Sequence, residues 1–121
     1  MQYMLLIYSD PSGWDSMSEA DQGALYTAYG TYTAELQASG KHVAGDALQG
    51  LETATSVRVR DGETLTTDGP FAETKEVLGG YYLIDVETLD EALEWAAKLP
   101  GSRYGTVEVR PVVTDYETMS A

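Results

Sequence analysis

The sequence contains no cysteine, one histidine and few basic residues, and each shortage excludes a class of chemistry. Without cysteine there is no disulfide, no thiolate nucleophile and no Cys-ligated zinc or iron–sulfur site. With His42 as the single histidine, a multi-histidine metal site could form only between chains. Seven basic against twenty acidic residues give a formal net charge of −13, which repels phosphate backbones and anionic membranes. We therefore expect no metal and no nucleic-acid or membrane partner.

Long hydrophobic runs and nucleotide-binding motifs are also missing. No apolar run approaches the roughly 20 residues that span a bilayer. Residues 1–10 lack the basic start and small-residue cleavage site of a signal peptide and are typical of a first strand, so the expected location is the cytoplasm. The chain has no GxxxxGK, GxSxG or HExxH motif, and no cofactor is expected.

What is present indicates one folded domain. The chain has 121 residues, a mass of 13.1 kDa and 43% hydrophobic residues, enough for a single core. No repeat, linker or low-complexity tract interrupts it. We expect a domain over residues 1–113 and a short polar tail over residues 114–121.

Apolar periodicity predicts an α+β fold with two helices. Ser18 is suited to cap the first helix and Gly40 to end it, and Thr88 begins a capping box for the second, which Pro100 ends. The predicted strands cover residues 3–8, 42–48, 57–60, 64–67, 81–86 and 106–113. This order is the ferredoxin-like βαββαβ pattern with an inserted β-hairpin that turns at Asp61-Gly62.

Two helices can cover only one face of such a sheet. The first strand is apolar on both faces, and Leu48 and Val112 add to the face that the helices leave open. An apolar face of this kind requires a partner, and a second copy of the chain provides one. We therefore expect a homodimer.

The stretch from Asp68-Gly69-Pro70-Phe71 through Glu73-Thr74-Lys75-Glu76 to Gly79-Gly80-Tyr81-Tyr82 resembles the YCII-related (YciI-like) family, in its DGPF-domain branch. The segments 93–100 and 107–111 add to the resemblance, which extends over the whole chain except the tail. It implies a ferredoxin-like subunit that pairs into a dimeric α/β barrel. It also implies a site made by an acid after the first strand, matched by Asp10, and a first-helix position that is histidine in YciI-like members and Tyr29 here.

The residues themselves give one further candidate for acid/base chemistry, His42, which counting by twos places on the same strand face as Asp46. The simpler interpretation, which we favour, is a surface or interface histidine with a satisfied hydrogen bond. Candidate residues for the rim of a cleft are Asp46, Asp68 and Arg110. Asp68 more simply holds its turn, and Arg110 more simply pairs across strands. Phe71, the single phenylalanine, is expected to be a buried anchor.

Three functions fit these observations. The first is a homodimeric module that binds a small molecule, with a regulatory role. The second is a small enzyme that uses acid/base chemistry in a cleft at the barrel end, with Asp10, Tyr29 and His42. The third is an interaction module connected with sigma-factor regulation, since the resemblance implies a genomic setting near alternative sigma factors.

Overall fold

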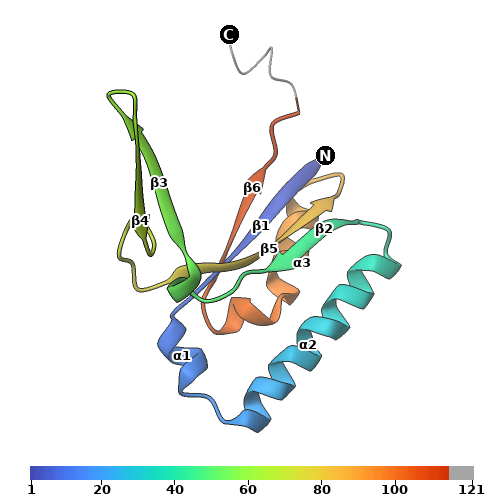
Figure 1. The fold of residues 1–121 in the computed structure, drawn as a ribbon. Helices are drawn as coiled ribbons and strands as arrows, with labels where there is room; N and C mark the ends of the chain where they lie inside the picture. The colour runs from blue at the N-terminus through green and yellow to red at the C-terminus, as the bar shows by residue number, and fades with distance from the viewer. Residues whose placement is uncertain (115–121) are drawn as a thin grey trace.

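The computed structural model describes residues 1–114 as a four-stranded antiparallel sheet, two long helices and a separate β-hairpin (Figure 1). The predicted tail lies outside the described residues except for Thr114. In chain order the elements are β1 (Gln2–Ser9), α1 (Pro11–Asp15), α2 (Glu19–Ala38), β2 (His42–Ala47), η1 (Leu51–Thr53), β3 (Thr55–Arg60), β4 (Glu63–Asp68), β5 (Val77–Asp85), α3 (Leu89–Lys98), η2 (Pro100–Arg103) and β6 (Thr106–Pro111).

The sheet has the strand order β2-β5-β1-β6, and every neighbouring pair is antiparallel. This arrangement agrees with the predicted ferredoxin-like type. No closed barrel is present in the described chain. The fifth strand begins at Val77, four residues before its predicted start, so it includes the glycine pair. A Cβ at Gly80 would lie 3.0 Å from the Asp46 carbonyl oxygen, and this close approach of β2 to β5 favours glycine.

The helix ends lie where side-chain capping predicts them. The Ser18 hydroxyl accepts a hydrogen bond from the Asp21 N–H at 3.1 Å, and the Thr88 hydroxyl accepts one from Glu91 at 3.2 Å. Gly40 follows α2 with a φ of 78°, a conformation that glycine adopts without strain. The segment after β1 forms the short helix α1, because Pro11 suits the first helical position and Asp10 caps it.

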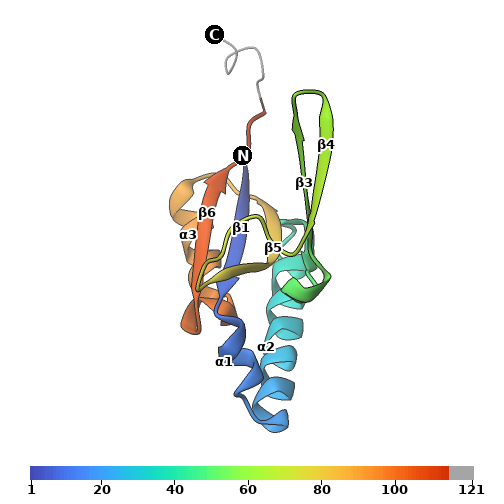
Figure 2. The ribbon, with the colours of Figure 1, turned by 60° about the vertical axis from the view of Figure 1, so that its left-hand side comes forward.

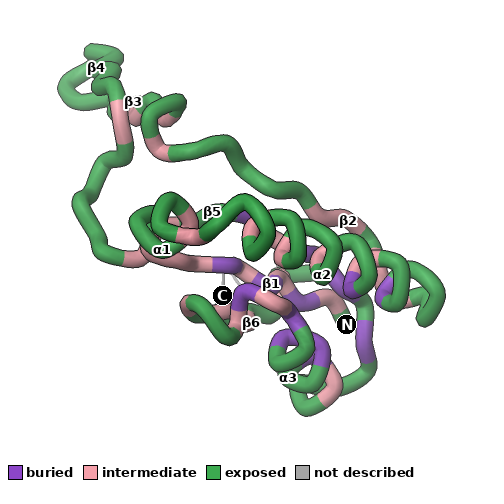
Figure 3. Tube along the Cα trace, turned by 90° about the horizontal axis from the view of Figure 1, so that it is seen from below, coloured by how far each residue is buried: buried purple, intermediate pink, exposed green. Residues whose placement is uncertain are grey.

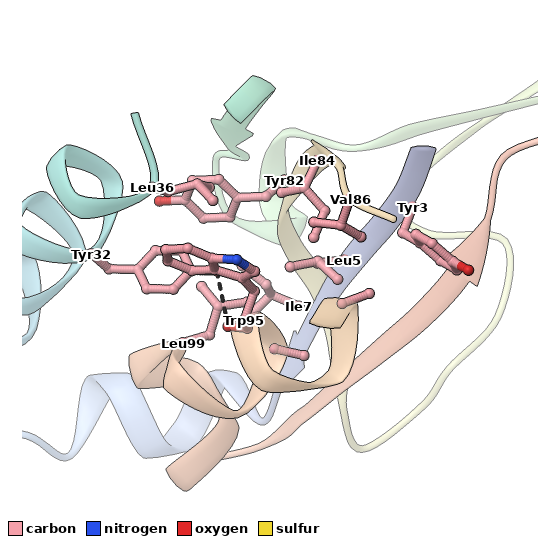
Figure 4. Close-up of a cluster of buried hydrophobic side chains, with 12 residues drawn as sticks. Tyr3, Leu5, Ile7, Tyr32, Leu36, Tyr82, Ile84, Val86, Trp95 and Leu99 are labelled. Atoms are coloured by element: carbon pink, nitrogen blue, oxygen red, sulfur yellow. Dashed lines mark hydrogen bonds between the residues drawn. The ribbon is translucent and has the colours of Figure 1, made fainter. Parts of the chain in front are cut away.

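Both helices cover the same face of the sheet (Figures 1 and 2). The core lies in this layer, and its most completely buried side chains are Leu5, Leu36, Ile84 and Leu99 (Figure 4). Figure 3 shows that the buried positions concentrate in the sheet and in the helix faces turned toward it. No helix among the described residues is long and apolar enough to cross a membrane.

No helix within residues 1–114 lies over the other face of the sheet, and we call it the uncovered face. Cross-strand pairing places Met4 beside Leu83, Leu6 beside Tyr81, and Tyr8 beside Leu78 on this face. Met4, Leu6, Tyr8, Tyr81 and Leu83 are half-buried, whereas Leu78 is 38% exposed. Leu48, the residue that follows β2, is 50% exposed.

Phe71 is 78% exposed, so the prediction of a buried anchor is wrong. The chain after β4 turns at Gly69, which has a φ of 97°, and then crosses an irregular segment before β5. Within the described chain, nothing covers the phenyl ring at this corner.

Candidate functional site

Asp10 lies at the end of β1 and caps α1. Its carboxylate accepts hydrogen bonds from the Ser12 N–H at 3.0 Å and the Ser12 hydroxyl at 2.8 Å. These bonds, chiefly the one from the hydroxyl, lower the pKa of Asp10, and the charge of Lys75 adds a smaller effect in the same direction. The side chain is therefore a carboxylate with an ordered geometry at neutral pH.

Asp10 shares a shallow, open concavity with four residues, namely Thr74, Lys75, Glu76 and Tyr104. The Thr106 hydroxyl donates to both Glu76 carboxylate oxygens, at 3.1 and 3.2 Å, and so fixes the orientation of that side chain. Thr74 donates its own hydroxyl hydrogen to the Glu76 carbonyl at 2.7 Å. Lys75 is exposed, and within residues 1–114 its ammonium group makes no ion pair.

None of these four neighbours was among the candidate site residues from the sequence. Three of them belong to the Glu73-Thr74-Lys75-Glu76 segment that carried the family resemblance, so this motif could have pointed to them as candidate site residues. Only the fold shows that this segment lies beside the end of β1, where Asp10 caps α1.

Tyr29 lies elsewhere, half-buried between α2 and η2. Its hydroxyl lies so close to Gly101 that a Cβ there would collide with it. Burial raises the pKa of Tyr29, and a hydrogen bond from the Gly101 backbone offsets part of this effect. Tyr29 is not among the residues that line the concavity beside Asp10.

His42 lies on the helix-covered face, and its imidazole meets the Tyr82 ring edge-on with centroids 6.2 Å apart. The prediction that His42 and Asp46 share a face is wrong. A bulge between His42 and Ala44 places His42 opposite the buried Ile84, whereas Asp46 lies opposite Tyr81 on the uncovered face. One extra residue in a strand reverses the face of every residue before it. β2 is also an edge strand, so His42 has no contact with Glu108 or Arg110 on β6 at the other edge.

The three predicted rim residues lie apart within one chain. Asp46 accepts a hydrogen bond from the Tyr81 hydroxyl at 2.9 Å, and this bond raises the pKa of Tyr81. Arg110 lies on β6, at the opposite edge of the sheet, beside Met4. Asp68 ends β4 in the separate hairpin. A rim made from all three would need more than one chain.

A hydrogen-bond network connects α2 with the sheet near Tyr29. Thr33 donates to the Tyr29 carbonyl at 2.9 Å, and its oxygen lies 2.5 Å from the Tyr82 hydroxyl. Because the single Thr33 hydroxyl hydrogen is used by Tyr29, Tyr82 is the donor in the second bond. Tyr32 donates to the Trp95 carbonyl at 2.9 Å and is buried, which raises its pKa. The bond between Thr33 and Tyr82 thus joins α2 to the sheet, and the bond between Tyr32 and Trp95 joins α2 to α3.

Within the described residues, no group of three or more His, Cys, Asp or Glu side chains is arranged to hold a metal ion. The arrangement around Asp10 instead places charges of both signs, a hydroxyl and an exposed aromatic ring around one open surface. Such a surface can bind a small polar molecule through hydrogen bonds and ion pairs.

Two comparisons describe what the chain is similar to. The family model of the YCII-related domain matches residues 1–115. An uncharacterized protein of Rhizobium meliloti (strain 1021) is 37% identical over 114 residues, which cover 93% of this chain and 92% of the relative.

Proposed function

Since the chain belongs to the YCII-related family, we propose that it is a homodimeric, small-molecule-binding member of the branch that carries the Asp68-Gly69-Pro70-Phe71 motif. Two copies pair through the uncovered face, and each binds a small zwitterionic molecule beside Asp10. The observation that carries the proposal is the continuous apolar surface of β1 and β5 on the side without helices.

Three adjacent cross-strand pairs make up this surface, led by Met4 with Leu83 and Leu6 with Tyr81. Complete burial of a leucine or methionine side chain contributes about 1.5–3 kcal/mol, so side chains that are already half-buried each gain about 1 kcal/mol from a partner. A two-fold axis through the face lets the same patch cover itself. The resulting pair of stacked sheets is the dimeric α/β barrel type.

Light scattering on the full chain tests the pairing. The expected mass is twice 13.1 kDa. A Leu83→Lys variant places a charge in the middle of the uncovered face and should have the monomer mass. The matched control is Leu93→Lys, because Leu93 is 46% exposed on the outside of α3. A monomeric wild-type protein would contradict the pairing.

The ligand class follows from the groups around the concavity. Asp10 and Glu76 suit an ammonium group, and Lys75, which makes no ion pair within residues 1–114, suits a carboxylate. Tyr104, 63% exposed, offers a ring for the apolar part of the ligand. A free amino acid combines these features.

Binding is tested by titrating a panel of the free amino acids into the protein and following amide chemical shifts by NMR. At least one amino acid should shift the resonances of residues 74–76, and Asp10→Asn or Lys75→Met should weaken that binding about tenfold, as loss of a charged hydrogen bond does. Asp15→Asn, a neutralised carboxylate elsewhere on α1, is the control. If no amino acid shifts these resonances, the ligand assignment is wrong.

The acid/base alternative has less support. A general base or acid works best with a pKa near the operating pH. Hydrogen bonds from Ser12 lower the pKa of Asp10, whereas burial raises the pKa of Tyr29, so both groups are moved away from neutrality. Binding without proton transfer fits the two residues better.

A further inference from the structure

The β3–β4 hairpin stands apart from the rest of the chain. In the part of the chain that the structure describes, its strands pair only with each other and form a second sheet. Every residue of both strands is exposed except Ser56, which is half-buried. Figures 1 and 2 show the hairpin projecting beyond the body, and Figure 3 shows it exposed along nearly its whole length.

Two hydrogen bonds close the base of the hairpin by joining its two ends to each other. The Ser56 hydroxyl donates to the Gly69 carbonyl at 2.7 Å, and the Gly69 N–H donates to the Ala54 carbonyl at 2.7 Å. A two-stranded hairpin without a covering layer is marginally stable in water. These base contacts fix where the hairpin starts but bury none of the side chains farther out.

The two faces of the hairpin differ in chemistry. Val57 and Val59 lie opposite Thr66 and Thr64 on one face, which we call the valine face. The other face carries Arg58 opposite Leu65, and Arg60 opposite Glu63. Alternation of this kind is typical of a strand pair with one face buried. Yet Val57 is 61% exposed and Val59 is 58% exposed.

We propose that the hairpin is a clasp that packs its valine face against a second copy of this chain. The inference rests on the homodimer proposed above and adds a second contact region to it. In Figure 1 the hairpin lies on the side of the sheet away from α2 and α3, which is the side of the uncovered face. A copy docked on that face comes within reach of the hairpin. Because the two copies are related by a two-fold axis, the hairpin of each copy contacts the other copy in the same way.

Charge supports a second copy as the occupant. The chain carries a formal net charge of −13, and the hairpin holds two of its seven basic residues, Arg58 and Arg60. The hairpin also holds three acidic residues, Asp61, Glu63 and Asp68, so its formal charge is near −1 while the body it reaches is strongly acidic. Arg58 and Arg60 lie on the face opposite the valines, so they act on the second copy at a distance, where their charges reduce the repulsion between two acidic proteins.

Two measurements on the full chain test the clasp. In hydrogen exchange, the amides of residues 55–68 should be protected at a concentration where the wild type is dimeric and should exchange faster in the Leu83→Lys monomer. In sedimentation, Val57→Thr combined with Val59→Thr should raise the dimer dissociation constant at least about tenfold, because both lose apolar contact while threonine keeps the shape and strand preference. Leu65→Thr, on the opposite face, is the matched control and should change it less than about threefold.

The outcomes separate the two proposals. A wild-type dimer whose hairpin amides exchange as fast as in the monomeric variant, with a dissociation constant unaffected by the valine substitutions, would overturn the clasp and leave the dimer standing. A wild-type protein that is monomeric would overturn both. An equal effect of Leu65→Thr and the valine pair would overturn the assignment of the docking face.

Discussion

The hydrogen bond between Tyr82 and Thr33 predicts different effects for removal of its donor and of its acceptor, because only one of the two hydroxyls can donate. Thr33 uses its hydrogen on the Tyr29 carbonyl, so Tyr82 donates and Thr33 accepts across 2.5 Å. Tyr82 is only 9% exposed, which makes loss of its partner more costly than loss of its own hydroxyl. The two single substitutions should therefore differ.

Tyr82→Phe removes the donor and should lower the free energy of unfolding by about 1 kcal/mol. Thr33→Val removes the acceptor, leaves the phenol without a partner, and should cost about 2 kcal/mol. The double variant has neither polar group and should cost about 2 kcal/mol, less than the sum of the single effects, which gives a coupling of about 1 kcal/mol.

Urea unfolding followed by tryptophan fluorescence measures all four proteins, at one protein concentration so that association does not change the comparison. Trp95 is a suitable reporter because Tyr32 lies edge-on between it and Tyr82, with ring centroids 5.9 and 5.2 Å apart. Single effects that add to within about 0.3 kcal/mol would refute the proposed hydrogen bond.

Three further predictions concern stability. Phe71→Ala should change the free energy of unfolding of the monomeric Leu83→Lys variant by less than about 1 kcal/mol in a urea melt, since the ring is 78% exposed. Burial raises the pKa of Tyr32 above its ordinary value of about 10. The neutral phenol therefore makes its full contribution to the free energy of unfolding below that pH, and the contribution is lost as the pH rises. In an alkaline titration, Tyr32→Phe should lose less stability than the wild type. Gly101→Ala should lower the melting temperature because its Cβ collides with the Tyr29 hydroxyl, and a second change, Tyr29→Phe, should restore part of the loss.

Local rules predicted much of the fold. The caps at Ser18 and Thr88 and the stop at Gly40 depend on side chains a few residues away, and the structure confirms all three. In β6, Val107 and Val109 alternate with the polar residues Glu108 and Arg110, and both valines pack against the core on the helix side. The Asp61-Gly62 turn lies where it was predicted, with Asp61 at a φ of 51°.

The wrong predictions concern residues whose position depends on contacts with segments far away in the sequence. The face of His42 depends on a bulge whose extra residue is visible only in the register between β2 and β5. Phe71 looked like a buried anchor because its residue type favours burial, but no apolar surface of the described chain reaches it. The concavity beside Asp10 depends on β1 and β5 pairing so that residues 74–76 return to its side.

The two edges of the main sheet have a consequence for how the protein behaves when concentrated. An exposed strand edge is a template for another strand, and uncontrolled addition there leads to fibrils. Here β2 is six residues long and interrupted by its bulge, and β6 carries Glu108 and Arg110 and ends in Pro111, which has no N–H to donate. Growth of the main sheet in its own plane is thus obstructed at both edges, so this sheet should not add strands to form thioflavin-binding fibrils when the protein is concentrated.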